Sequence, residues 1–416
     1  MRVGAHGRAA LAQGMLLAPQ IDDSYLLNLA SRLVEIPSVS GAEQPIIDFL
    51  EREFCAHGLH CRRFPLEPGR DNLLVEAHGR AALQPRLTSG GPVLCLNAHA
   101  DTVPPIRATL KGRRQGGPEG PPTGRSQARA HLAEGKLYGL GSCDDKGPLA
   151  AMAAALLALK DARLNGRLDL LVTLEEETLG RGAREAIAQG YRCNWAIVAE
   201  PTSLQIVPAH AGLIFLRLQA AGRACHGATP ERGENAIEKL FSFVQALRAQ
   251  VSSRMKPHPL IGSPSLNLGV LRGGDAPNRV ADRAEALVDI RVIPPATTAD
   301  IAQLVEHSLA QSEWSGISCD IQKAGEALCT PTDGVLVRAL KEEAAAIIGS
   351  SPSIAGLRAW TEAESFQTGL GIEAVVFGPG SVEHAHTEDE FVPVDELAVA
   401  ARIYANCALR LLGGGV

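Results

Sequence analysis

Apolar side chains recur three and four positions apart from Tyr25 to about His57, which predicts amphipathic helix. Pro37 and Gly41 interrupt this spacing, so we expect two helices in place of one. The pattern then changes. Val93–Ala98 is a short and continuous apolar run, which is typical of a strand buried on both faces of a sheet.

The next patterned segments alternate between helix and strand. An Ala- and Leu-rich helix is predicted from Pro148 to Ala162, with proline at its start, where the missing N–H costs nothing. Two further apolar runs, Leu168–Leu174 and Trp195–Ala199, enclose a predicted helix at Gly182–Gln189. Strand, helix and strand in this order imply parallel pairing and an α/β domain.

After Pro208 the order of elements is different. Strands are predicted at Leu213–Ala220, Ser265–Leu271 and Ala284–Val292, with helices at Asn235–Ala249 and Thr298–Leu309. This β-α-β-β-α order suits a small sheet with helices on one face. The α/β pattern then resumes with helix Val335–Ile348, strand Ala374–Phe377 and helix Asp395–Leu412.

These patterns predict one α/β domain interrupted by a smaller α+β domain. We expect an N-terminal tail at 1–22, the first part of the larger domain at 23–210, the inserted smaller domain at 211–322, and the second part of the larger domain at 323–416. Within the first part, the Gly-, Pro- and Arg-rich segment 104–133 predicts a long mobile surface loop.

Composition narrows the classes of function. The formal net charge is -6 and aromatic residues make up 4% of the chain, which argues against nucleic acid as the main partner. No apolar run approaches the about 20 residues of a membrane span, so we expect no membrane partner. The nine cysteines are scattered, odd in number and without a C-x-x-C pair, which favours reduced thiols in a cytoplasmic protein.

Acidic and imidazole side chains follow several of the predicted strands. In open α/β sheets, ligands bind at the carboxyl ends of the strands. The residues concerned are His99 and Asp101, Asp144 and Asp145, Glu175–Glu177, Glu200 and His386. Taken singly, each has a plainer explanation: a turn pair, a solvated acidic face, or a turn before proline.

Taken together, these acidic and imidazole side chains favour a metal-binding site over the plainer explanations. Glu175–Glu177 follows seven strand residues without a break, so part of the triplet should lie at the buried end of the sheet. Burying several carboxylates without positive charge costs several kcal/mol or more. Divalent cations are an effective compensation, and imidazoles with carboxylates suit zinc, with cobalt or manganese as alternatives.

The chain resembles the di-zinc amidohydrolase and peptidase family that includes acetylornithine deacetylase, succinyl-diaminopimelate desuccinylase, aminoacylase and glutamate carboxypeptidase. The resemblance runs from about Leu26 to Leu411. It implies a zinc-exopeptidase-like mixed sheet flanked by helices, with an inserted ferredoxin-like dimerisation domain. The motifs that carry it, in family order, are His99–Pro104, Gly139–Gly147, Glu175–Glu177, Glu200–Thr202 and Ala385–Thr387.

The resemblance also implies roles for these residues. Two divalent metal ions would be held by His99, Asp144, Glu177, Glu200 and His386, with Asp144 bridging both ions. Asp101 would fix the ring of His99 from behind.

Glu176 would be the general base. The family usually has Asp-Glu-Glu, so Glu175 replaces an aspartate and the triple glutamate leaves the register ambiguous by one residue. Gly180 and Gly182 fall where the family pattern expects them when Glu176 is the base.

Three residues of the insert match positions that contact substrate in relatives. His226 would reach the site of the partner subunit and help to hold the carbonyl oxygen, while Asn278 and Arg291 would contact the substrate's carboxylate. The structural alternatives are a loop histidine with local partners and an arginine paired with a nearby acid.

We therefore expect an enzyme that cleaves the amide bond of a small N-acyl amino acid, as a homodimer joined through the insert. Cleavage of a short peptide, by a metallo-carboxypeptidase or dipeptidase of the same family, is the alternative with the same chemistry. A catalytically inactive dimeric binding protein is the alternative from another class. A missing base or ligand would indicate it, and none is missing.

Overall fold

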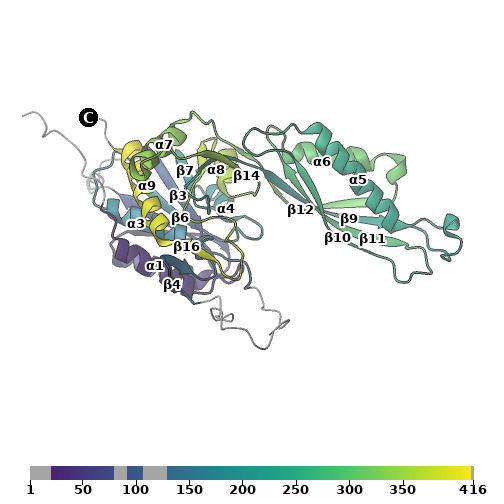
Figure 1. Cartoon of the computed structure of the whole chain (residues 1–416), viewed down its shortest axis with the longest axis horizontal. Helices are drawn as coiled ribbons and strands as arrows, with labels where there is room; N and C mark the ends of the chain where they lie inside the picture. The colour runs from purple at the N-terminus through teal and green to yellow at the C-terminus, as the bar shows by residue number, and fades with distance from the viewer. Residues whose placement is uncertain (1–19, 79–90, 106–128, 414–416) are drawn as a thin grey trace, which may run out of the picture.

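One mixed sheet organises the larger part of the molecule (Figure 1). The structure, a computed structural model, describes residues 20–78, 91–105 and 129–413. Within these residues the sheet has nine strands, with β14 (Ile354–Leu357) pairing with β8 beside the main path. In order across the sheet, the others are β1 (His60–Glu67), β2 (Arg70–His78), β6 (Arg167–Thr173), β3 (Val93–His99), β7 (Trp195–Val198), β15 (Glu373–Val376), β8 (Ile206–His210) and β13 (Leu328–Cys329).

The centre of this sheet is parallel, as the strand-helix-strand pattern predicts. β3 pairs in parallel with β6 and β7 on its two sides, and β15 continues the parallel set beyond β7. Leu96 of β3 lies level with Leu170 and Ile197 of its neighbours, so apolar side chains stack across the sheet. The antiparallel hairpin of β1 and β2 at the edge was not predicted.

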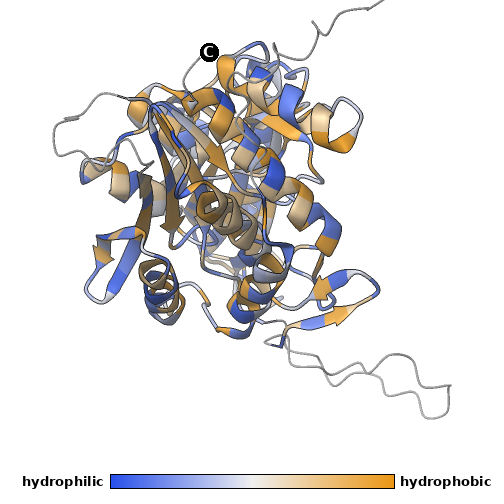
Figure 2. Cartoon of the chain, turned by 90° about the vertical axis from the view of Figure 1, so that its left-hand side faces the viewer, coloured by the Kyte–Doolittle hydropathy of each residue, from blue (hydrophilic) through white to orange (hydrophobic). Residues whose placement is uncertain are grey.

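Helices cover both faces of the sheet. One face packs against α1 (Asp23–Glu35), α2 (Gln44–Ala56), α3 (Lys146–Leu159), α7 (Val335–Ile348) and α9 (Val394–Leu412). The other face packs against α4 (Gly182–Ala188) and α8 (Ala363–Leu370). Alternate residues of the strands point to opposite faces and so contribute to two apolar cores, one on each face of the sheet. Figure 2 shows hydrophobic colour on the inner strands and hydrophilic colour on outward helical turns.

The helix α3 is buried over almost its whole length, which explains why its sequence is rich in alanine and leucine. It lies between α1, α9 and the sheet. The helix begins at Lys146, so Pro148 is its third residue and not the first as expected. Proline is tolerated there because the first N–H groups of a helix have no intrahelical partner.

The inserted segment forms a second, antiparallel sheet that extends away from the first (Figure 1). Its strands, in order, are β10 (Ser265–Gly273), β11 (Arg283–Val292), β9 (Gly212–Ala221) and β12 (Ile317–Gly325). The helices α5 (Ala236–Arg254) and α6 (Thr298–Leu309) lie on one face and share a separate apolar core with it. The strand β12 was not predicted. The short 3-10 helices η2 (Pro230–Arg232) and η3 (Ser312–Trp314) complete the segment.

A small third sheet includes the last residues of the loop predicted at 104–133. It consists of β16 (Phe391–Pro393), β5 (Lys136–Tyr138) and β4 (His131–Ala133), all antiparallel. Residues 106–128 of the predicted loop lie outside the described residues, as does most of the expected tail at 1–22. The prediction is wrong for the last residues of the loop, because β4 pairs with β5 there. Among the described residues, no helix has the length and apolar content needed to cross a bilayer.

The packing of β3 predicts a large loss of stability on truncation. Leu96 is 0% exposed at the centre of the sheet, so Leu96→Ala should lower the free energy of unfolding by about 2–5 kcal/mol. Leu132 in β4 is 49% exposed, and Leu132→Ala should change it by less than about 0.5 kcal/mol. Urea denaturation of both variants in the presence of a chelator measures the difference, and equal losses would contradict the assigned core.

Candidate metal centre

The predicted chemical residues meet at one edge of the parallel sheet. His99 is the last residue of β3, the triplet Glu175–Glu177 follows β6, and Glu200 comes two residues after β7. These three strands are neighbours in the order β6-β3-β7, so their carboxyl ends are adjacent. Asp144 lies in the turn before α3, and His386 lies in the loop after β15.

Asp144 occupies the middle of this cluster. Its Oδ1 is 2.8 Å from Nε2 of His99, and its Oδ2 is 3.4 Å from Nε2 of His386. The same His386 nitrogen lies 2.8 Å from Oε1 of Glu177. Each carboxylate oxygen of Asp144 therefore faces a different imidazole, which is the arrangement that a carboxylate shared by two cations requires.

The donor atoms are close enough to surround ions. Those of His99, Asp144 and Glu177 all lie within 4.8 Å of one another, and the same holds for His99, Glu176 and Glu200. Two imidazoles with buried carboxylates are a donor set that suits zinc and its neighbours. All five predicted metal ligands and the predicted base are thus brought into one cluster.

The raised pKa values in the cluster indicate that its carboxylates are stabilised by protons or other positive charges. Burial is the main factor that raises the pKa of Glu176, to about 8, and that of Glu200. Hydrogen bonds to Asp144 and Glu177 raise the pKa of His386 to about 10. Burial opposes protonation of His99, but contacts with Asp101 and Asp144 raise its pKa all the same. Cations that bind here would displace these protons.

Asp101 does more than the predicted support of His99. Its carboxylate lies 3.4 Å from Nδ1 of His99, while its own backbone carbonyl accepts the hydrogen bond from that nitrogen at 3.1 Å. The carboxylate oxygens accept hydrogen bonds from the backbone N–H groups of Glu176 and Glu177, at 3.1 and 3.2 Å, and from Ser40 Oγ at 2.7 Å. Asp101 thus fixes the backbone of the proposed base and of its neighbour.

Sequence reasoning missed Glu390. This buried side chain accepts hydrogen bonds from the backbone N–H groups of Cys143 and Asp144, at 3.0 and 3.1 Å, and so holds the turn that presents Asp144. Burial is the main factor that raises its pKa to about 7. It lies four residues after His386 in an acidic run, which was the only sequence signal. Asp145 supports the other side, accepting from the His99 N–H at 3.2 Å.

The two glycines that fix the register have clear steric reasons. Gly180 has φ +61°, and a Cβ there would lie 2.2 Å from the ring of Trp360. A Cβ on Gly182 would lie 2.6 Å from the carbonyl oxygen of Leu174. The loop after the glutamate triplet therefore packs too closely against its surroundings for any side chain at either position.

The insert touches this loop through one residue that the sequence did not single out. Lys323 of β12 donates a hydrogen bond to the carbonyl of Thr178, next to Glu177. Its ammonium also lies 4.7 Å from the ring centroid of Trp360. These contacts join the second sheet to the loop that carries Glu176.

The three predicted substrate-binding residues are not brought together. Arg291 pairs with Leu213 at the end of the second sheet nearest to β8, and its guanidinium lies 3.1 Å from Asp289. His226 and Asn278 lie in exposed loops beyond the opposite end, where the Gly227 N–H donates to the Asn278 carbonyl at 2.8 Å. A strand of ten residues separates these ends by about 30 Å, so His226 and Asn278 lie far from the metal ligands of their own chain.

Comparison with known proteins agrees with this geometry. Residues 95–410 match the family described as peptidase family M20/M25/M40. The chain belongs to this family. It is also 32% identical over 388 residues to acetylornithine deacetylase from Proteus mirabilis, which covers 88% of this chain and 91% of the relative. The predicted family resemblance and the mixed α/β fold are confirmed.

Solved structures of the family share this fold. A tripeptidase from Staphylococcus aureus superposes with a TM-score of 0.74 at 22% identity, over 94% of this chain and 99% of that one. A dinuclear metal-binding M20 peptidase from Bacillus subtilis superposes with a TM-score of 0.65 at 18% identity, over 94% and 98% of the two chains. With the cluster described above, family membership makes this protein a metal-dependent amidohydrolase.

The central position of Asp144 predicts coupled metal binding and stability. Zinc at about 100 times its dissociation constant should stabilise the metal-free wild type by about 2.7 kcal/mol. Asp144→Asn should lose most of this gain, because it removes charge from the residue that both imidazoles contact. Asp389→Asn, at an exposed acid outside the cluster, should keep it. Thermal unfolding with and without zinc measures the gain, and an unchanged response in Asp144→Asn would argue against the site.

Proposed function

We propose that this M20-family protein hydrolyses the amide bond of a small N-acyl amino acid. The observation that carries the proposal is the convergence of two histidines and four acids on one strand edge, with Asp144 between the two imidazoles. The similarity to acetylornithine deacetylases at about 30% identity supports deacylation over peptide cleavage.

Two divalent ions, zinc by preference over cobalt or manganese, would be held by residues of this cluster. His99 and Glu200 would hold one ion, Glu177 and His386 would hold the other, and Asp144 would be shared between them. The contacts of His386 with Glu177 and Asp144, and the closeness of His99 to Glu200, support this pairing. When bound, such ions supply Lewis acidity to the attacking water and to the amide carbonyl.

Glu176 performs the proton transfers. It accepts a proton from the attacking water and passes it to the nitrogen of the departing amine. The backbone hydrogen bond from Glu176 to Asp101 holds this half-buried carboxylate beside the cluster, where its contact with bulk water is reduced. One side chain serves both steps because it stays next to the reacting atoms throughout.

Substrate recognition involves the insert. Arg291 binds the carboxylate of the amino acid in the site of its own subunit, while Asn278 and His226 act from the partner subunit, on that carboxylate and on the carbonyl oxygen respectively. The exposed position of His226, about a full strand length from the near end of the second sheet, supports its action in a partner's site.

The partner is a second copy of this chain, joined through the insert. β10 is an edge strand of nine residues with no neighbour on its outer side among the described residues. Leu271 of this strand is exposed, as is Phe241 of α5, the helix that packs against β10. Pairing of β10 with the same strand of a second copy would cover both edges around a two-fold axis.

We also propose a cytoplasmic setting. The nine cysteines are all free thiols, which supports a reducing compartment and hence the cytoplasm. The ligands proposed for this protein are small molecules, and neither nucleic acid nor membrane is among them.

A substrate panel tests the function directly. Purified zinc-loaded protein should release free amino acid from N²-acetylornithine or another acetyl or succinyl amino acid, and should cleave dipeptides less efficiently, as judged by kcat/KM. Preference for peptides would favour the exopeptidase alternative of the same family. Absence of all hydrolysis by metal-loaded protein would favour the inactive binding protein.

Replacement of the base should separate catalysis from metal binding. Glu176→Gln should keep the zinc content of the wild type while kcat falls by about 10²–10⁴-fold, the usual range for general acid–base catalysis. Glu177→Gln is the matched control, because removal of a ligand should lower zinc content. If Glu176→Gln instead loses metal, Glu176 is a ligand and the register of the triplet is off by one.

The dimer can be tested at its apolar edge. Leu271→Lys should give monomers by light scattering at micromolar protein and should lower turnover, because His226 then cannot reach a second site. Ile348→Lys places the same charge at a similarly exposed residue of α7, and it should leave the dimer intact. A monomeric wild type with full activity would contradict this proposal, as would His226→Ala with undiminished turnover.

A further inference from the structure

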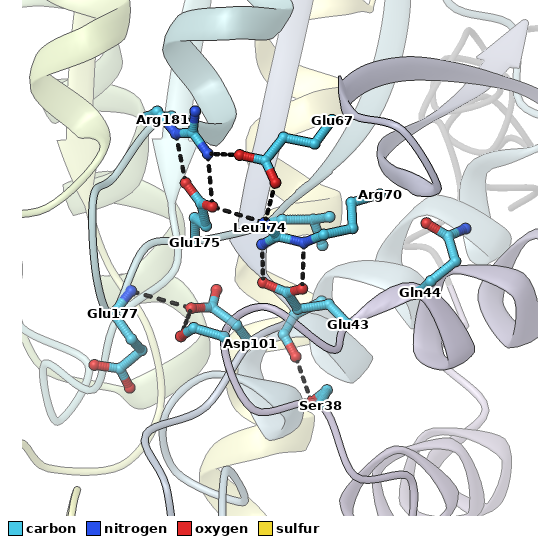
Figure 3. A network of polar contacts seen from close by, with 12 residues as sticks. Ser38, Glu43, Gln44, Glu67, Arg70, Asp101, Leu174, Glu175, Glu177 and Arg181 are labelled. Carbon is cyan, nitrogen blue, oxygen red and sulfur yellow. Dashed lines mark hydrogen bonds and ion pairs between the residues drawn. The ribbon is translucent and has the colours of Figure 1, made fainter.

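A network of five charged side chains lies beside the loop that carries Glu177 (Figure 3). We call it the arginine network. Its members are Glu43, Glu67, Arg70, Glu175 and Arg181. None of its members is a proposed metal ligand or base, yet Glu175 is the residue immediately before Glu176 and two before Glu177.

Arg70 connects the triplet to the start of α2. Its guanidinium forms two hydrogen bonds with Glu43, at 2.7 and 3.0 Å, and a third with Oε1 of Glu175 at 2.8 Å. Glu43 is fully buried and the Arg70 side chain is 14% exposed. Charge-assisted hydrogen bonds in such a setting are directional and are weakly screened by water.

Arg181 holds the same carboxylate from the other side. Its Nε lies 2.6 Å from Oε2 of Glu175 and its NH2 lies 2.7 Å from Oε1, which is a bidentate pair. Arg181 also reaches Glu67 at the turn between β1 and β2. Glu175 therefore receives three hydrogen bonds from two guanidinium groups, and its side chain points away from that of Glu177 (Figure 3).

The backbone of Glu175 shows what these bonds maintain. Its φ is +67°, in the left-handed region that residues other than glycine seldom adopt. Its carbonyl accepts hydrogen bonds from the N–H groups of Thr178 and Gly180, at 3.3 and 2.7 Å, which closes a tight turn. Within that turn, the N–H groups of Glu176 and Glu177 face Asp101. The turn is thus fixed by Asp101 on one side and by the arginine network on the other.

We propose that Arg70 and Arg181 are positioning residues, which act through Glu175 to hold Glu176 and Glu177 in the geometry needed for proton transfer and metal binding. The proposal rests on the proposed function for the roles of Glu176 and Glu177. It assigns to the first glutamate of the triplet an anchoring role, with no contact to metal or substrate.

The chain offers a matched control in Arg63. Its guanidinium bonds to three acids, Asp48, Glu51 and Asp71, and so ties α2 to the β1–β2 hairpin as Arg70 does. The side chains of Arg63 and Arg181 are 30% and 32% exposed. Within the described residues, Arg63 makes no ion pair or hydrogen bond with Glu175–Glu177, so its removal reports the general effect of losing a salt-bridge cluster here.

The experiment compares Arg181→Met with Arg63→Met in the full chain. Removing a residue that orients metal ligands typically lowers affinity or activity by about 10–100-fold. Arg181→Met should show that loss in kcat and in zinc affinity, with KM changed much less. Arg63→Met should stay near the wild type in all three. The visible absorption spectrum of the Co²⁺-loaded protein should change in Arg181→Met alone, because ligand geometry has changed.

Conservative variants complete the test. Arg181→Lys keeps the charge without the bidentate geometry, and should recover only part of the loss. If Arg181→Met does not fold, Glu175→Gln carries the same expectation for kcat, zinc affinity and the Co²⁺ spectrum. Equal behaviour of the Arg181 and Arg63 variants would overturn the proposal. If the wild type hydrolyses nothing, the proposed function fails, while the Co²⁺ spectrum and zinc affinity still decide the positioning role.

Discussion

Several carboxylates crowd the carboxyl ends of β6, β3 and β7, and they must be matched by positive charge. An uncompensated carboxylate in such a place costs several kcal/mol, so each needs a cation or a proton nearby. In the candidate metal centre, His99 and His386 contact Asp144 and Glu177, and divalent ions fit the same donors. Beside the loop that carries Glu177, Arg70 and Arg181 contact Glu175. The carboxylates at this edge of the sheet therefore fall into two groups. One group can bind metal ions, and the other is neutralised by arginine side chains.

The glutamate triplet contributes to both groups: Glu175 contacts the arginines, whereas Glu176 and Glu177 lie in the candidate metal centre. Three identical side chains in succession take three different environments because the turn at Glu175 redirects the chain. The Asp101 carboxylate accepts hydrogen bonds from the N–H groups of Glu176 and Glu177 and also lies beside His99. One buried carboxylate therefore contacts both the loop of the proposed base and a proposed metal ligand. This arrangement links β3 and β6 at the point where the chemistry is proposed, and it makes the geometry of the base dependent on residues that never approach a substrate.

The second sheet imposes a different constraint. Its strands are long enough to separate Arg291 from His226 and Asn278 by most of the length of the insert. A substrate that contacts all three therefore needs either a large closing movement or a second chain, and the unpaired edge at β10 favours the second chain. Lys323 gives the insert a direct contact with the turn that carries Glu176, so movement of the insert and the position of the base are not independent.

Much of this protein could be predicted from its sequence because periodicity and strand-end chemistry are local signals. The helices at Val335–Ile348 and Thr298–Leu309 have the predicted bounds, since an amphipathic stripe depends only on spacing. His99, Asp144, Glu177, Glu200 and His386 were named as ligands because the motifs that contain them resemble those of the family, and most of these motifs follow predicted strands. β12 was missed although Ile317, Cys319 and Ile321 alternate with polar residues, and the edge hairpin of β1 and β2 gave a weaker signal because polar residues interrupt it.

The remaining features were decided by the tertiary structure. The sequence predicted that cations would compensate the buried part of the triplet, but it could not indicate that Arg181 and an arginine distant along the chain, Arg70, would neutralise Glu175. Arg70 lies more than a hundred residues from Glu175, and only the pairing of β2 with β6 brings the two together. The role of Glu390 depends in the same way on the turn before α3, far away in sequence. Residue type and spacing fix which groups can bind metal, whereas long-range strand pairing decides which charges neutralise them, because electrostatic partners are selected by distance in space.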